Sequence, residues 1–153
     1  MNYQKVLEQP VEALLPHSGD MVFLDQVIAC EEHALVSRVV IRDNCPLFDH
    51  LKGHMPAWVG IEWMAQSVSA MAGVHRLADG KDVLLGFLLG ARSYQSYCDS
   101  FTLGEELIVR VNRNYQEGDL GAFDCLIERD GKIVAEATIT AFQPEDYQAY
   151  LQE

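Results

Sequence analysis

The most constraining feature of this sequence is residues 57–77, AWVGIEWMAQSVSAMAGVHRL, the longest helical pattern in the chain, which begins directly after Pro56. Proline suits the first turn of a helix, where its missing N–H costs no hydrogen bond. Residues spaced by three and four fill one face, and they are Trp58, Ile61, Ala65, Val68 and Ala72. Further apolar residues fill much of the remainder, and they are Val59, Trp63, Met64, Ala70 and Met71. A helix that is apolar nearly all round requires other structure to cover it.

The rest of the chain supplies strands to cover this helix. Residues 10–15 predict a short helix, residues 22–30 and 34–41 predict a strand pair, and residues 42–56 are expected to be irregular. Four more strands are predicted at 83–94, 106–116, 121–129 and 132–142, with the glycines in the first indicating a bulge. Asp130–Gly131 between the last two is a strong hairpin signal. This order predicts an α+β hotdog fold, in which an antiparallel sheet wraps around one long central helix.

Length and composition indicate one soluble globular domain. The chain has 153 residues, of which 49% are hydrophobic and 22% charged, and it shows no internal repeat. We expect a single domain over 1–153, with an N-terminal segment at 1–19 and an acidic tail at 143–153. Residues 83–91 are too short and too rich in glycine to cross a membrane, and the N-terminus lacks a signal-peptide pattern. The four cysteines form no CxxC pair, so we expect reduced thiols, no zinc and a cytoplasmic location.

The charge balance limits the partners of the chain. Eleven basic residues stand against 23 acidic ones, which gives a formal net charge of −12. Nucleic-acid binding depends on a basic surface, so no nucleic-acid partner is expected.

Residues 53–66, GHMPAWVGIEWMAQ, contain the strongest candidates for chemistry. His54 lies in the loop before the apolar helix, and Glu62 lies within its first two turns. A neutral imidazole can take up a proton, and a carboxyl group in an apolar setting can donate one, as general acid–base catalysis requires. Two structural alternatives remain. Glu62 can belong to a solvent-facing polar stripe with Gln66, Ser69 and Gly73, and His54 can bond only to backbone. A metal site with His50 is not predicted, because no third ligand is evident.

The same segment resembles the active-site signature of the 3-hydroxyacyl-acyl carrier protein dehydratases of fatty acid synthesis. His54 matches the family histidine of a Gly-His-Phe-Pro loop, Glu62 matches the acidic residue, and Met64–Ala65–Gln66 match the tripeptide that follows. Leu15–Pro16–His17, the run at 22–27 and the segments at 90–92 and 101–105 extend the similarity over most of residues 14–142. The loop after His54 is shorter than in most of the family, a form similar to the dehydratase-like proteins of bacterial aryl polyene gene clusters.

This resemblance implies a mechanism and a set of site residues. His54 would remove the proton beside the thioester carbonyl, Glu62 would protonate the leaving 3-hydroxyl, and the N–H of Gly60 would stabilise the thioester oxygen. The reaction needs no cofactor. The family also implies further substrate-binding residues, and they are Trp58, Trp63, Phe87 and Arg92. For the three aromatic residues, packing in the core is an alternative.

The resemblance also implies the partners. These are an acyl carrier protein bearing the substrate, and a second subunit that forms either a homodimer or a heterodimer with a dehydratase paralogue. Acyl carrier proteins are acidic, so docking requires a local basic patch or a basic partner subunit. The patch candidates are Lys52, Arg76, Arg92, Arg110 and Arg113. Two other functions stay open: a hotdog thioesterase that uses Glu62 to activate water, and a non-catalytic subunit that pairs with an active paralogue.

Overall fold

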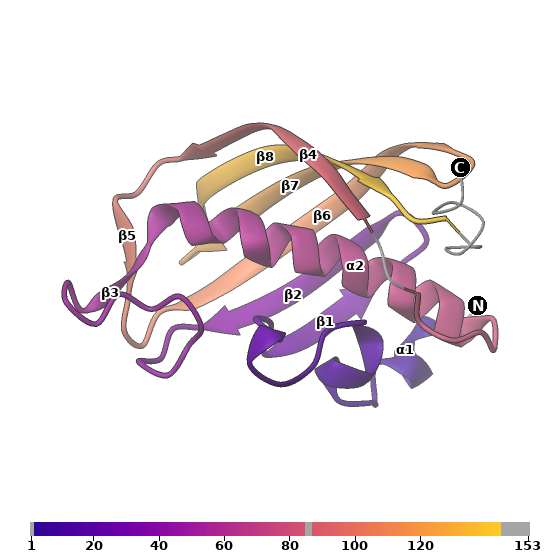
Figure 1. Ribbon diagram of the computed structural model, residues 1–153, viewed down its shortest axis with the longest axis horizontal. Helices are drawn as coiled ribbons and strands as arrows, with labels where there is room; N and C mark the ends of the chain where they lie inside the picture. The colour runs from indigo at the N-terminus through magenta and orange to yellow at the C-terminus, as the bar shows by residue number, and fades with distance from the viewer. Residues whose placement is uncertain (1, 85–86, 145–153) are drawn as a thin grey trace.

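A computed structural model shows a curved antiparallel sheet folded over one side of a long helix (Figure 1). It describes residues 2–84 and 87–144, without the side chains of residues 87–89, 91 and 92. The sheet has the strand order β1-β2-β6-β7-β8-β4, and a second, two-stranded sheet pairs β3 with β5. The helices are α1 (Tyr3–Val6), η1 (Val11–Leu14), η2 (Gly19–Met21), η3 (Ala57–Val59) and α2 (Gly60–Ala78). The strands are β1 (Gln26–Cys30), β2 (Ala34–Val40), β3 (His54–Pro56), β4 (Phe87–Ser96), β5 (Ser100–Thr102), β6 (Glu106–Glu117), β7 (Leu120–Arg129) and β8 (Lys132–Phe142).

The local sequence patterns of the large sheet are confirmed. In β6, Leu107, Val109 and Val111 are fully buried while the residues between them are not, as a strand with one face on the core requires. Asp130 and Gly131 have φ values of 53° and 78°, the two positive values that a type I′ hairpin turn needs. The register of β4 against β8 shifts around Gly90, where a bulge was expected.

The sheet covers one side of α2, and the most buried side of this helix is not the apolar face that contains Trp58. Trp63, Met64, Ala70, Met71 and Val74 are at most 2% exposed. The face that contains Trp58 lies away from the deepest part of the core. Trp58 is 54% exposed, Val68 is buried, and the other members are half-buried, namely Ile61, Ala65 and Ala72. Both faces of α2 are apolar, so periodicity alone could not decide which one meets the sheet.

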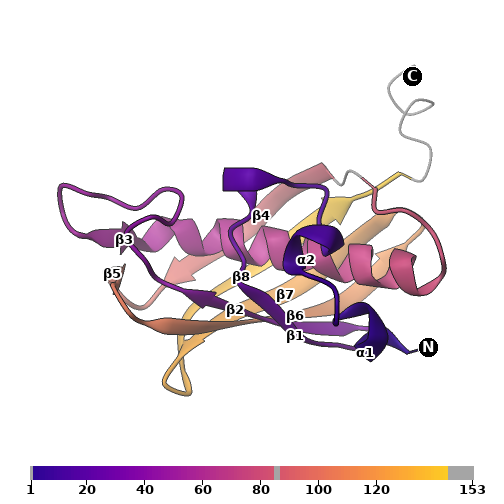
Figure 2. The ribbon, with the colours of Figure 1, turned by 90° about the horizontal axis from the view of Figure 1, so that it is seen from below.

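Two close contacts attach α2 to the rest of the chain. Ser37 of β2 and Ser67 of α2 are fully buried and share a hydrogen bond of 2.7 Å. At Gly73, a Cβ atom would overlap the backbone carbonyl of Leu14, so only glycine lets η1 lie this close to the helix. Figure 2 shows the N-terminal segment running alongside α2. These contacts set the position of α2 relative to both the sheet and the N-terminal segment.

Several expected boundaries differ from the structure. The helical segment 57–77 divides into η3 and α2, and residues 22–25 precede β1 instead of belonging to it. Strands β3 and β5 were not predicted, because three residues are too few to show an alternating pattern. Residues 85–86 of the predicted strand 83–94 and residues 145–153 of the tail lie outside the described residues.

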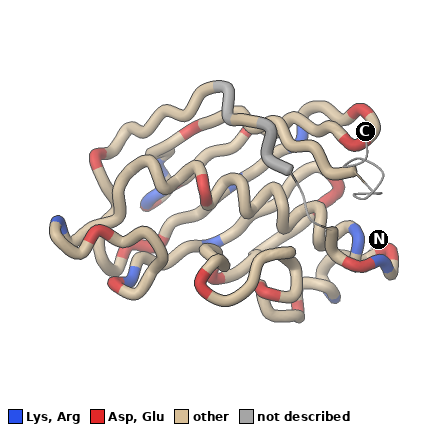
Figure 3. The backbone as a smooth tube through the Cα atoms, in the orientation of Figure 1, with Lys and Arg blue, Asp and Glu red and all other residues tan. Residues whose placement is uncertain are grey.

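The distribution of charged residues and the hydropathy of the helices agree with the composition. Figure 3 shows acidic residues spread over turns and strand ends, in keeping with the net charge of −12. In the described part of the chain, no helix is both long and apolar enough to cross a membrane.

Candidate active site

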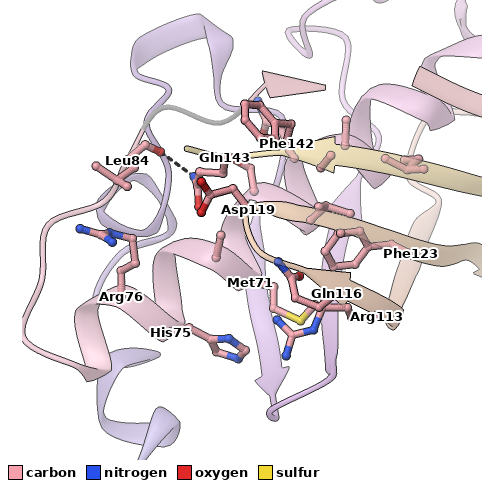
Figure 4. Close-up of a pocket in the computed structure, with 18 of the residues that line it drawn as sticks. Met71, His75, Arg76, Leu84, Arg113, Gln116, Asp119, Phe123, Phe142 and Gln143 are labelled. Atoms are coloured by element: carbon pink, nitrogen blue, oxygen red, sulfur yellow. Dashed lines mark hydrogen bonds between the residues drawn. The ribbon is translucent and has the colours of Figure 1, made fainter. Parts of the chain in front are cut away.

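A cavity of about 490 Å³ runs along α2 between the helix, the N-terminal segment and the ends of β6, β7 and β8. Glu62, Gln66 and Ser69 line it from α2, and His17 lines it from the N-terminal segment. Apolar residues also line the cavity, among them Phe23, Val68, Met71, Phe123 and Ile139. Figure 4 shows the part between the C-terminal half of α2 and the β6–β7 turn, where Gln143 Nε2 donates to Leu84 O over 3.0 Å. The space is elongated and mixed in polarity, with one carboxylate on α2.

The polar stripe of α2 turns inward to this cavity and the core. Gln66 is only 3% exposed: its Oε1 accepts a hydrogen bond of 2.9 Å from the Phe23 N–H, and its Nε2 donates to Met21 O. Gln66 therefore holds the segment before β1 against α2, one helical turn after Glu62. The solvent-facing alternative for this stripe is wrong for Gln66 and for Gly73, which is also buried.

His17 is the ionisable residue that the N-terminal segment contributes to the cavity of Glu62. Its Nδ1 is buried and has no hydrogen-bond partner among the described residues. Burial lowers the pKa of His17. Nothing in the spacing of His17 and Glu62 indicates that they share a cavity. In the sequence, His17 stood out only as part of the Leu15–Pro16–His17 motif.

His54 ends a compact loop that begins at Asp49, and it is the first residue of β3. It is not among the described residues that line the cavity. The Asp49 N–H donates to His54 O over 3.0 Å, and the His54 and Gly53 N–H groups donate to Asp49 O over 3.3 and 2.8 Å. The side chain of Asp49 also accepts the N–H groups of Leu51 and Lys52. This network holds His54 at the start of β3, and one chain does not bring His54 into the cavity of Glu62.

Strand β5 supports β3 from its other side. His54 pairs with Thr102, and Met55 pairs with Phe101, which is fully buried. The ring of Phe101 packs against Trp63 with centroids 5.0 Å apart. Trp63 thus lies in the core and links α2 to the strand pair that carries His54. The Nδ1 of His54 is buried without a partner among the described residues, as it is for His17.

Gly60 begins α2 at a crowded point. Its N–H already donates to Ala57 O, which also accepts a hydrogen bond of 2.6 Å from the Tyr94 hydroxyl. A Cβ atom at Gly60 would overlap that hydroxyl, and burial raises the pKa of Tyr94 to about 12. The expected free donor at Gly60 is therefore engaged inside the protein in this structure. The first N–H groups of η3 precede any helical acceptor.

The other predicted substrate-binding residues are placed as follows. Trp63 lies in the core and not at the cavity, whereas Trp58 is more than half exposed and so packs neither in the core nor in the cavity. The backbones of Phe87 and Arg92 belong to β4, but their side chains lie outside the described residues.

Part of the predicted basic patch does line the cavity. Arg76 and Arg113 are among its lining residues, together with Lys81. Arg113 donates to Glu32 O over 3.1 Å, and the guanidinium of Arg110 pairs with Glu128 on the neighbouring strand. The basic residues are thus divided between the cavity and the surface of the sheet.

An antiparallel sheet around one long helix, with a cavity that follows the helix past a carboxylate, defines this protein as a member of the hotdog class. A family model described as ApeP dehydratase, of the ApeP-like group, matches residues 9–152. The chain belongs to the ApeP-like dehydratase family.

Individual proteins agree with this assignment. A chain of the dehydratase heterocomplex ApeI:P from Xenorhabdus doucetiae superposes with a TM-score of 0.87 and is 29% identical, with 94% of this chain and 97% of that chain covered. The 3-hydroxyacyl-acyl-carrier-protein dehydratase FabZ of Brucella melitensis is 24% identical over 139 residues, which cover 87% of this chain and 85% of that protein. A hypothetical thioesterase of Streptococcus pneumoniae, solved with coenzyme A, has a TM-score of 0.61 at 16% identity, with 77% and 86% of the two chains covered. This last similarity shows the fold alone.

Proposed function

We propose that this chain is one subunit of a dehydratase that removes water from 3-hydroxyacyl thioesters held on an acyl carrier protein. Membership of the ApeP-like family and the similarity to FabZ support the reaction and the carrier. The observation that carries the proposal is the cavity along α2, since it places Glu62 in a long, partly apolar space suited to an acyl chain. Fatty acid and aryl polyene synthesis are the routes such a reaction serves, and we propose a cytoplasmic location for it.

The elimination needs one base and one acid. The base removes a proton from the carbon beside the thioester carbonyl, and the electron pair forms the C2=C3 double bond as the C3–O bond breaks. Glu62, in its protonated form, donates to the leaving oxygen and releases water. A carboxyl group that lines the substrate cavity can serve as the general acid of this step. The products are a 2-enoyl thioester and one water molecule, so no cofactor is needed.

We propose that the base that works with Glu62 comes from a second subunit. His54 does not line the cavity of Glu62 in its own chain. The similar chain from Xenorhabdus doucetiae belongs to a complex of two dehydratases, which favours a heterodimer with a paralogue. In such a dimer Glu62 would meet the histidine of the partner, and His54 would meet the acid of the partner. The partner would also offset the negative charge of this chain when an acidic carrier protein docks.

The test is turnover of a 3-hydroxyacyl carrier-protein substrate by the chain alone and with its co-expressed paralogue. We expect activity with the paralogue, and we expect Glu62→Gln to lower turnover at its own composite site by about 10²-fold or more, so that the activity that remains is that of the second site. His54→Ala reports on the second composite site, and the double variant reports on both. Ser93→Ala on β4 is a control, because that serine is exposed and outside the cavity.

The products decide between the candidate functions. An enoyl thioester indicates dehydration, whereas a free acid and a free thiol indicate a thioesterase. If the Glu62→Gln, His54→Ala double variant keeps the full activity of the complex, this chain is a non-catalytic subunit and the proposed roles are wrong.

A further inference from the structure

His17 and Glu62 come from segments far apart in the sequence, yet both line the cavity along α2. The two hydrogen bonds of Gln66 to Met21 O and the Phe23 N–H hold the segment that follows His17 against the helix. Gln66 lies four residues after Glu62, so the attachment is one helical turn from the carboxylate. The geometry therefore keeps an imidazole and a carboxyl group in one space.

The surroundings of His17 favour one protonation state. Its Nδ1 is buried without a partner among the described residues, and burial lowers the pKa of the imidazole. The charged form would bury an unpaired N–H, so the ring is neutral at pH 7. A buried unpaired N–H is rarer in proteins than an unpaired acceptor, which favours the tautomer with its proton on Nε2. The ring then offers Nε2–H as a hydrogen-bond donor.

Other ionisable groups also face this cavity. They are Glu62, His75, Arg76, Lys81, Arg113 and Asp119. Desolvation is the cause of the lowered pKa of His17, so its neutral state follows from burial and not from a nearby cation.

We infer that His17 contacts the substrate and donates a hydrogen bond from Nε2 to the thioester carbonyl oxygen during dehydration. This inference rests on the proposed function. Loss of the α-proton places negative charge on that oxygen, which then needs a donor. The N–H of Gly60, which the family resemblance suggests for this role, is bonded to Ala57 O.

Three substitutions test the inference, and their parent is the assembled dehydratase that carries His54→Ala and so reacts only at the site of Glu62. His17→Gln places an amide N–H close to the position of Nε2, His17→Asn places one close to Nδ1, and His17→Phe fills the volume without a donor. We expect His17→Gln to stay within a few-fold of the parent. We expect kcat to fall about 10- to 100-fold in the other two, as for loss of a hydrogen bond to a charged group. KM should change little, because the oxygen carries its charge only in the transition state.

A second measurement does not depend on activity. Nitrogen-15 NMR of the His17 ring should show a neutral imidazole protonated at Nε2 at pH 7. A proton on Nδ1, or a charged ring, overturns the inference whatever the kinetics show. Equal turnover in the parent and in His17→Phe also overturns it while leaving the dehydratase proposal intact. Absence of any enoyl product from the complex without substitutions removes the proposed function, and with it this inference, even if the ring has the expected tautomer.

Discussion

For the buried hydroxyl pair between β2 and α2, we predict that alanine substitution destabilises the protein more at one serine than at the other. Ser37 Oγ and Ser67 Oγ are 2.7 Å apart, and Ser67 Oγ donates to Trp63 O over 2.8 Å. A hydroxyl has one proton, so the proton of Ser67 is used by that carbonyl and Ser37 must be the donor to Ser67. Both side chains are fully buried, and water cannot replace either partner.

The two alanine substitutions should therefore differ. Ser67→Ala removes the acceptor and leaves the hydroxyl of Ser37 buried and unpaired, which costs about 1–3 kcal/mol in addition to the lost bonds of about 1 kcal/mol. Ser37→Ala leaves Ser67 bonded to Trp63 O and should cost only about 1 kcal/mol. The double variant leaves no unpaired hydroxyl, so its cost should lie near that of Ser37→Ala and well below the sum of the two.

Urea denaturation of the parent, both single variants and the double variant at pH 7 measures these free energies of unfolding. Each kcal/mol should also shift Tm by about 2–4 °C in a chain of this size. Ser93→Ala is the matched control, since that serine is exposed and should change stability by less than about 0.5 kcal/mol. Equal costs for the two single variants, or costs that simply add, would refute the assigned direction of the hydrogen bonds.

Three further predictions concern the stability of the fold: two follow from substitutions and one from a change in pH. Gly73→Ala should destabilise the protein by about 1–3 kcal/mol, because the added methyl group overlaps Leu14 O; unchanged urea midpoints would contradict this close approach. Burial lowers the pKa values of His17 and His75 below their ordinary value of about 6.5, so the unfolded chain binds more protons just below that pH. Their contribution to stability is fully present above a pH of about 6.5 and should be lost as the pH falls through the lower folded pKa values. Urea denaturation at a series of descending pH values checks this, and a free energy of unfolding that rises as the pH falls would contradict it. Asp49→Ala should cost about 1 kcal/mol and Asp49→Asn less, since asparagine keeps the Oδ1 acceptor for the loop before β3, and thermal unfolding can compare the two.

Local patterns were sufficient for most of the fold. The alternation in β6 and the Asp130–Gly131 turn each depend on neighbouring residues only, and both were predicted correctly. The proline before residue 57 and the run of apolar residues after it identified the helical segment, although its first turn is η3. Short elements such as β5 were missed because their existence depends on a pairing partner and not on their own pattern.

Local sequence patterns were not sufficient to predict the candidate site. Trp58 and Trp63 are both aromatic residues of the same helical segment, but the first is exposed and the second packs against Phe101. Which face of an all-round apolar helix is buried depends on where the sheet lies, and that is a property of the assembled chain. The inward turn of Gln66 likewise follows from its contacts with the segment before β1, more than forty positions away in the sequence.

The sequence by itself determined the hotdog fold, the long apolar helix and Glu62 as its candidate acid, because periodicity and a short motif encode these features locally. Only the tertiary structure decided that His17 shares the cavity of Glu62, that His54 lies outside it, and that the N–H of Gly60 is already bonded. The physical reason is that a cavity has no sequence period: it forms where distant segments meet, and packing and hydrogen bonding between those segments set what faces it.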